Sequence, residues 1–98
     1  MSEEETIELA RTGGSRFIVT VRSAGRQTVH DVAMPPRLLE DLALGPDDED
    51  RLVRASFEFL LEREPPSSIL RRFDLEIISR YFPEYAATMR ARLVADRP

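Results

Sequence analysis

His30 is the side chain of this sequence best suited to proton transfer near neutral pH, because the chain has one histidine and no cysteine. A hydrolytic triad would need His30 to meet a serine and an acid. Asp31 cannot be that acid, since neighbouring strand residues point to opposite faces, and no serine lies in a nucleophile-elbow motif. No further ligands stand at metal-binding spacing from His30. We therefore predict a surface or hydrogen-bonded strand histidine, no catalytic residues, no metal and no cofactor.

Two other motifs could bind ions or phosphate. The acidic run at 47–50 could attract a divalent cation, but it lacks the glycine-containing pattern of a calcium loop. Capping and charge–dipole attraction at a helix start explain it better. Gly13-Gly14 is too short for a phosphate loop and predicts a hairpin turn.

The basic residues are all arginine, which indicates a GC-rich bacterial genome. The net charge of −4 argues against non-specific binding to nucleic acid or to anionic membranes. One alternative stays open, a nucleic-acid-linked, antitoxin-like regulator. Its candidate contacts are Arg11, Arg16, Arg22, Arg26, Arg71 and Arg72. Residues 67–82 could also form a helix-turn-helix, but the helix that would read DNA is mostly apolar, which predicts burial.

Aromatic side chains concentrate in one stretch, since six of the seven lie within residues 57–85. Core packing is the simplest interpretation. The alternative is a partly exposed patch that docks a partner, with Tyr81, Tyr85 and Arg80 as its candidate residues, because tyrosine and arginine are enriched at interface hot spots. A cavity among the aromatics that binds a small molecule is a further alternative.

Residues 52–85 include the segment SFEFLLEREPPSSILRRFDLEIISRYFPEY. Its PP, FDL and YFPEY elements resemble a group of small bacterial proteins without assigned function. The resemblance implies a recurrent fold unit and supplies no activity or ligand. The order of a sheet followed by helices is also similar to HicB-type antitoxins, an analogy at the level of the fold.

The elements that would position these residues can be read from hydrophobic periodicity. Three strands are predicted at about 6–11, 16–22 and 26–33, with short connections that favour an antiparallel meander. Helices are predicted at about 37–44, 48–64, 68–73, 75–82 and 84–94, with Gly45 as a left-handed C-cap and Asp74 as an N-cap. Apolar side chains cover about 240° of the second helix, so it should be central to the core or to a dimer.

The length of 98 residues suits a single α+β domain, with residues 1–5 and 95–98 expected to fray. No signal peptide or membrane span is predicted, so we expect a cytoplasmic protein. The sequence favours a small non-enzymatic interaction module that is homodimeric or bound to another protein.

Overall fold

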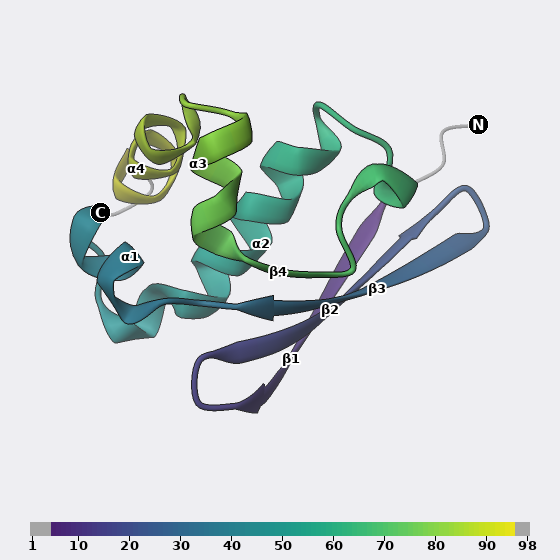
Figure 1. Cartoon of the computed structure of the whole chain (residues 1–98), viewed down its shortest axis with the longest axis horizontal. Helices are drawn as coiled ribbons and strands as arrows, with labels where there is room; N and C mark the ends of the chain where they lie inside the picture. Colours follow the sequence, from purple (N-terminus) through teal and green to yellow (C-terminus); the bar gives the residue numbers. More distant parts are fainter. Residues whose placement is uncertain (1–4, 96–98) are drawn as a thin grey trace.

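The computed structural model describes residues 5–95. Of the residues predicted to fray, 1–4 and 96–98 lie outside this range, Glu5 precedes the first strand, and Ala95 ends the last helix. A four-stranded sheet in the order β1-β2-β3-β4 has the helices gathered on one of its faces (Figure 1). The predicted α+β class is confirmed.

The first three strands form the predicted meander. They are β1 Thr6–Gly13, β2 Arg16–Ser23 and β3 Arg26–Ala33, and both pairings are antiparallel. The alternation in β2 places Phe17, Val19 and Val21 against the core, each 0% exposed. Ala24 and Gly25 turn the second hairpin with φ values of 55° and 75°. Two successive positive φ values match a type I′ turn, whose twist suits adjacent strands.

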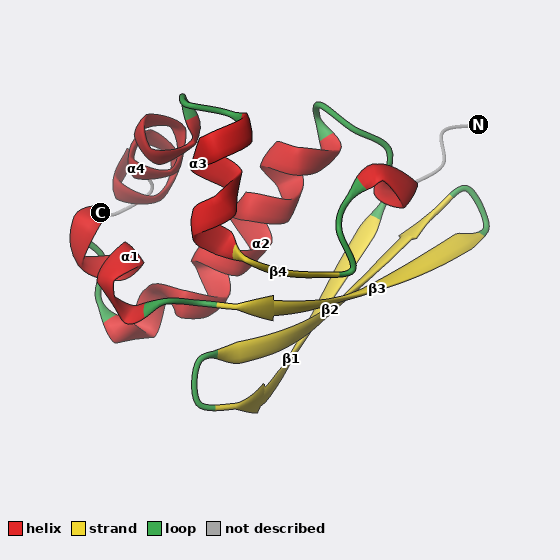
Figure 2. Cartoon of the chain, in the orientation of Figure 1, coloured by secondary structure: helices red, strands yellow, loops and turns green. Residues whose placement is uncertain are grey.

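The helix predicted at 68–73 is wrong. A 3-10 turn, η2 Pro66–Ser68, leads into a short strand, β4 Arg72–Asp74 (Figure 2). This strand pairs in parallel with β3, and Phe73 lies opposite Val32. The Asp31 N–H also donates to the Arg71 carbonyl at 2.7 Å. Long-range backbone pairing therefore overrides the local helical preference of the segment.

The remaining predicted helices exist, three of them shorter than predicted and the last one shifted by one residue. They are α1 Pro36–Asp41, α2 Glu49–Leu61, α3 Ile78–Tyr81 and α4 Tyr85–Ala95, with 3-10 turns η1 Pro46–Asp48 and η3 Leu75–Ile77. The Asp74 carboxylate accepts from the Glu76 N–H at 2.8 Å, as predicted for an N-cap. Gly45 is not a left-handed C-cap, because its φ is −98° and Ala43 takes the positive value of 59°.

The α2 helix lies between the sheet and the C-terminal helices. Phe57 and Phe59 are two residues apart, so they point about 200° apart around the helix. Phe57 contacts His30 and Phe73 on the sheet side, whereas Phe59 meets Phe82 and Tyr85 on the other side. Both phenylalanines are 0% exposed. The broad apolar arc of this helix is thus covered within one chain.

Candidate functional site

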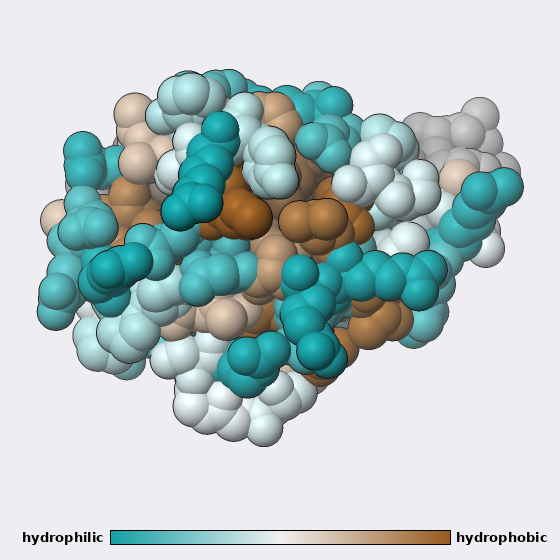
Figure 3. Space-filling view, in the orientation of Figure 1, coloured by the Kyte–Doolittle hydropathy of each residue, from teal (hydrophilic) through white to brown (hydrophobic). Residues whose placement is uncertain are grey.

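An apolar groove of about 270 Å³ opens beside the aromatic stretch. Its walls come from the end of α2, the segment from η2 into β4, and the η3–α3 turns. The groove is lined by Leu60, Glu64, Ser68, Ile69, Leu70, Phe73, Ile77, Ile78, Tyr81 and Phe82. Figure 3 shows hydrophobic surface between α3 and the chain entering β4, bordered by hydrophilic side chains. Buried core residues form the floor of the groove, so its shape is fixed by the packing of the core.

Two exposed apolar side chains stand at this groove. Tyr81 is 65% exposed and Leu70 is 48% exposed. Within residues 5–95 only one other large apolar side chain is similarly exposed, Val29 at 46%. Val29 lies on the sheet face opposite the helices, because its neighbours His30 and Thr28 point inward. Exposed apolar surface is therefore concentrated at the groove.

Within residues 5–95, two arginines that are next in sequence to groove residues have no ion pair or hydrogen bond from their guanidinium groups. Arg71 follows Leu70 directly and Arg80 precedes Tyr81, and both arginines are exposed. Across the described part of the chain, Arg26 in the β2–β3 hairpin is the other arginine in this state. Of the three residues predicted for a partner surface, Tyr81 thus lies exposed at the groove, and Arg80 is exposed and next to it in sequence.

Tyr85 is placed elsewhere, in the core. It is 0% exposed, and its hydroxyl lies 2.7 Å from the Ser56 hydroxyl. Burial raises the pKa of Tyr85 to about 12. The sequence treats Tyr81 and Tyr85 as neighbours one turn apart on a helix, but Phe82 between them is extended, with φ −133° and ψ 90°. The two tyrosines consequently lie on separate helices and point to different environments.

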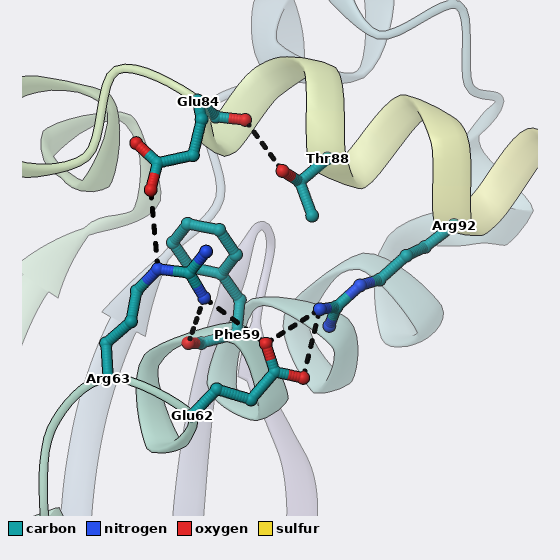
Figure 4. Close-up of polar contacts among 6 residues, drawn as sticks. All are labelled: Phe59, Glu62, Arg63, Glu84, Thr88 and Arg92. Atoms are coloured by element: carbon teal, nitrogen blue, oxygen red, sulfur yellow. Dashed lines mark hydrogen bonds and ion pairs between the residues drawn. The ribbon is translucent and has the colours of Figure 1, made fainter.

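An arginine clamp, which the sequence analysis missed, fixes the wall of the groove that Phe82 forms. The Arg63 guanidinium stacks 3.6 Å from the centre of the Phe59 ring and lies 5.8 Å from that of Phe82. Arg63 also donates to the Phe59 carbonyl and pairs with Glu62 and Glu84, as Figure 4 shows. No sequence motif marks this clamp, because its partners come from the end of α2 and from the connection between α3 and α4.

A second ion pair extends the clamp toward the end of α4. Arg92 donates to both Glu62 carboxylate oxygens, at 2.8 and 3.0 Å (Figure 4). The hydrogen bond from Arg92 holds the pKa of Glu62 below its usual value. Together the two arginines fasten the end of α2 to α4.

His30 holds the opposite wall of the groove. It is 1% exposed, and its Nδ1 lies 2.7 Å from the Leu70 carbonyl. A carbonyl only accepts, so Nδ1 carries a proton and donates. In the neutral ring, Nε2 therefore accepts from the Thr28 hydroxyl at 2.9 Å. Burial lowers the pKa of His30. His30 is thus hydrogen-bonded, the second of the two predicted alternatives, and it anchors the segment that enters β4.

The arginines predicted as nucleic-acid contacts do not form one free cationic face. Arg11 pairs with Glu49 and Asp50, Arg16 and Arg72 share Asp31, and Arg22 pairs with Glu8. Strand alternation also turns Arg11 and Arg26 to the helix side of the sheet and Arg16 and Arg22 to the other side. Four of these six arginines are thus neutralised by carboxylates.

The acidic run at 47–50 caps and pairs locally. The Asp48 carboxylate accepts from the Gly45 N–H at 3.0 Å and from Arg51 at 2.9 Å. Within residues 5–95 no group of three histidine, aspartate or glutamate side chains could hold a metal ion. The helices of the same range are all too short or too polar to span a bilayer.

Searches against protein-family models, curated proteins and solved structures found no significant match to this chain. The resemblance of residues 52–85 to small bacterial proteins stays a prediction.

Proposed function

We propose that this chain is a small, non-enzymatic protein-interaction module whose contact surface is the groove between α3 and β4. One observation carries the proposal: two of the three exposed large apolar side chains within residues 5–95, Leu70 and Tyr81, stand at this groove. Clustered exposed apolar surface with a polar border is typical of a docking site. Tyrosine and arginine beside it are the residue types that dominate binding energy at interfaces.

A protein partner fits the groove better than a small molecule does. The volume of the groove, about 270 Å³, is below the range of about 300–1,000 Å³ usual for ligand pockets. Polar side chains in the lining are limited to Glu64, Ser68 and Tyr81, and Tyr81 is largely in solvent. A small ligand would have few converging polar groups to orient it.

The breadth of the apolar arc on α2 no longer supports a dimer, since the sheet and the C-terminal helices cover it. A second copy of the chain is one partner that could use the groove. Nucleic acid is supported less well, because carboxylates already pair with Arg11, Arg16, Arg22 and Arg72.

Site-specific photocrosslinking in the native cells tests the proposal. A benzophenone amino acid replaces Tyr81 in one variant and Val29 in a control variant. Val29 is comparably exposed but lies on the bare face of the sheet. We expect a discrete protein adduct from position 81 and none from position 29. An adduct with a second copy of the chain would identify a homodimer. Absence of an adduct at position 81, or identical adducts from both positions, would contradict the proposal.

A further inference from the structure

We infer that the partner presents an acidic amphipathic segment, with apolar side chains that fill the groove and carboxylates that pair with Arg71 and Arg80. This inference rests on the proposed function and adds the chemistry of the partner. The juxtaposition that carries it is an apolar hollow whose exposed lining residues, Leu70 and Tyr81, are each next in sequence to an exposed arginine. Within residues 5–95 neither arginine has an ion pair or a hydrogen bond from its guanidinium group.

The free guanidinium groups stand out against the other arginines of the chain. Apart from Arg26, the other arginines in residues 5–95 bind carboxylates or backbone carbonyls: Arg37 holds Glu76, Arg54 donates to the Ile7 carbonyl, and Arg90 donates to the Asp41 carbonyl. The chain carries 18 acidic residues against 14 basic ones, so carboxylates are in excess. Two of the three arginines without such contacts nevertheless lie next to the groove residues Leu70 and Tyr81 in sequence.

The charge at the groove also favours an acidic partner. Glu64 is the single acid of the lining and is only partly exposed, whereas Arg71 and Arg80 are both exposed. The overall charge of −4 opposes an acidic partner only weakly at this range, because salt screens exposed charges beyond about 8 Å. A guanidinium beside an apolar surface can bind a carboxylate bidentately while its stem adds apolar contact.

Selection from a random peptide library tests the inference. The full-length protein is the bait, and a Leu70→Ser/Tyr81→Ser variant removes peptides that bind outside the groove. We expect groove-dependent peptides that combine aliphatic or aromatic residues with aspartate or glutamate. Apolar peptides without acidic enrichment, or with basic enrichment, would overturn this inference and leave the proposed function standing. A selection that yields no groove-dependent peptide would count against both.

Charge reversal of the selected complex provides a second measurement. In an Arg71→Glu/Arg80→Glu variant we expect the affinity for the selected peptide to fall at least about tenfold. Added salt, which should weaken peptide binding by the wild type, should then no longer weaken it. Arg26→Glu is the matched control, since this equally free arginine lies about 16 Å along β3 from the start of β4. Its affinity should equal that of the wild type. Equal losses in both variants would show that net charge, rather than the groove, attracts the peptide.

Discussion

Replacing Ser56 with alanine should destabilise the protein by removing the acceptor of a buried tyrosine hydroxyl. The Ser56 hydroxyl lies 2.7 Å from the Leu52 carbonyl, which can only accept, so Ser56 donates there. Tyr85 must then donate to Ser56 across their 2.7 Å contact. The other neighbour is the Met89 sulfur, 3.9 Å from the Ser56 oxygen and a weak acceptor. The substitution therefore leaves the Tyr85 hydroxyl buried without a strong acceptor.

The expected magnitude follows from these contacts. A buried donor left unsatisfied costs about 1–3 kcal/mol. Alanine at this helical position returns up to about 0.5 kcal/mol through its helix propensity. A net loss of about 1–2.5 kcal/mol should result. Tyr85→Phe keeps the ring packed and removes the donor itself, so we expect a loss of about 1 kcal/mol.

Urea and thermal unfolding of the wild type, the two single variants and the double variant complete a double-mutant cycle. Each 1 kcal/mol should lower Tm by about 4–8 °C in a chain of this size. Because the double variant has neither donor nor acceptor, it should be more stable than the sum of the single losses predicts, by about 1 kcal/mol. Thr88→Ala is the control, since it removes a similar bond to the Glu84 carbonyl at an exposed site.

Additivity of the two single losses to within about 0.3 kcal/mol would refute the reasoning. It would mean that Tyr85 and Ser56 do not share a hydrogen bond in the folded protein. A Thr88→Ala loss as large as that of Ser56→Ala would also contradict it, because burial would then play no part in the cost.

Three further predictions concern ionisation and backbone conformation. In a Tyr81→Phe variant Tyr85 is the remaining tyrosine, so tyrosinate absorbance should appear with a midpoint near pH 12, and the free energy of unfolding should fall as the pH rises from 10 toward 12. Because the pKa of His30 is lowered in the folded protein, His30 of the unfolded chain becomes protonated at a higher pH than His30 of the folded chain. Urea unfolding should therefore show stability falling as the pH drops below 6.5, by at most about 1.4 kcal/mol per unit, and a His30→Gln variant should lose this slope. Ala24→Asn should raise Tm in thermal unfolding, by an amount equivalent to about 0.5–1 kcal/mol, because asparagine tolerates the positive φ of this turn better than alanine.

Local patterning was sufficient to predict most of the fold. The alternation in β2, the two hairpin turns and the acidic start of α2 each depend on a few neighbouring residues, and all three lie where the sequence predicts them. The strand β4 could not be found in this way. Its extended form depends on β3 and on the His30 contact with Leu70, some 40 positions apart in sequence. Helical spacing in ILRRF gave the opposite prediction.

The candidate site was predicted only in part, because exposure is a property of the assembled fold. Tyr81 and Tyr85 look equivalent in the sequence, and only the break at Phe82 sends one to the surface and the other to Ser56. The sequence also does not show that Arg71 and Arg80 lack ion pairs within residues 5–95, since this depends on where the carboxylates of distant elements lie. Composition could suggest the residue types, but it could not select the individual side chains.

The packing of the core does not explain why apolar side chains stand exposed at positions 70 and 81. Hydrogen bonds from β3 to the carbonyls of Leu70 and Arg71 fix the segment so that Ile69 turns inward, 6% exposed, and Leu70 turns outward. The core is complete without Leu70, because the sheet and the C-terminal helices already enclose α2. A polar residue at position 70 or 81 would serve folding as well and solubility better. The presence of leucine and tyrosine there therefore supports the proposed contact with a partner.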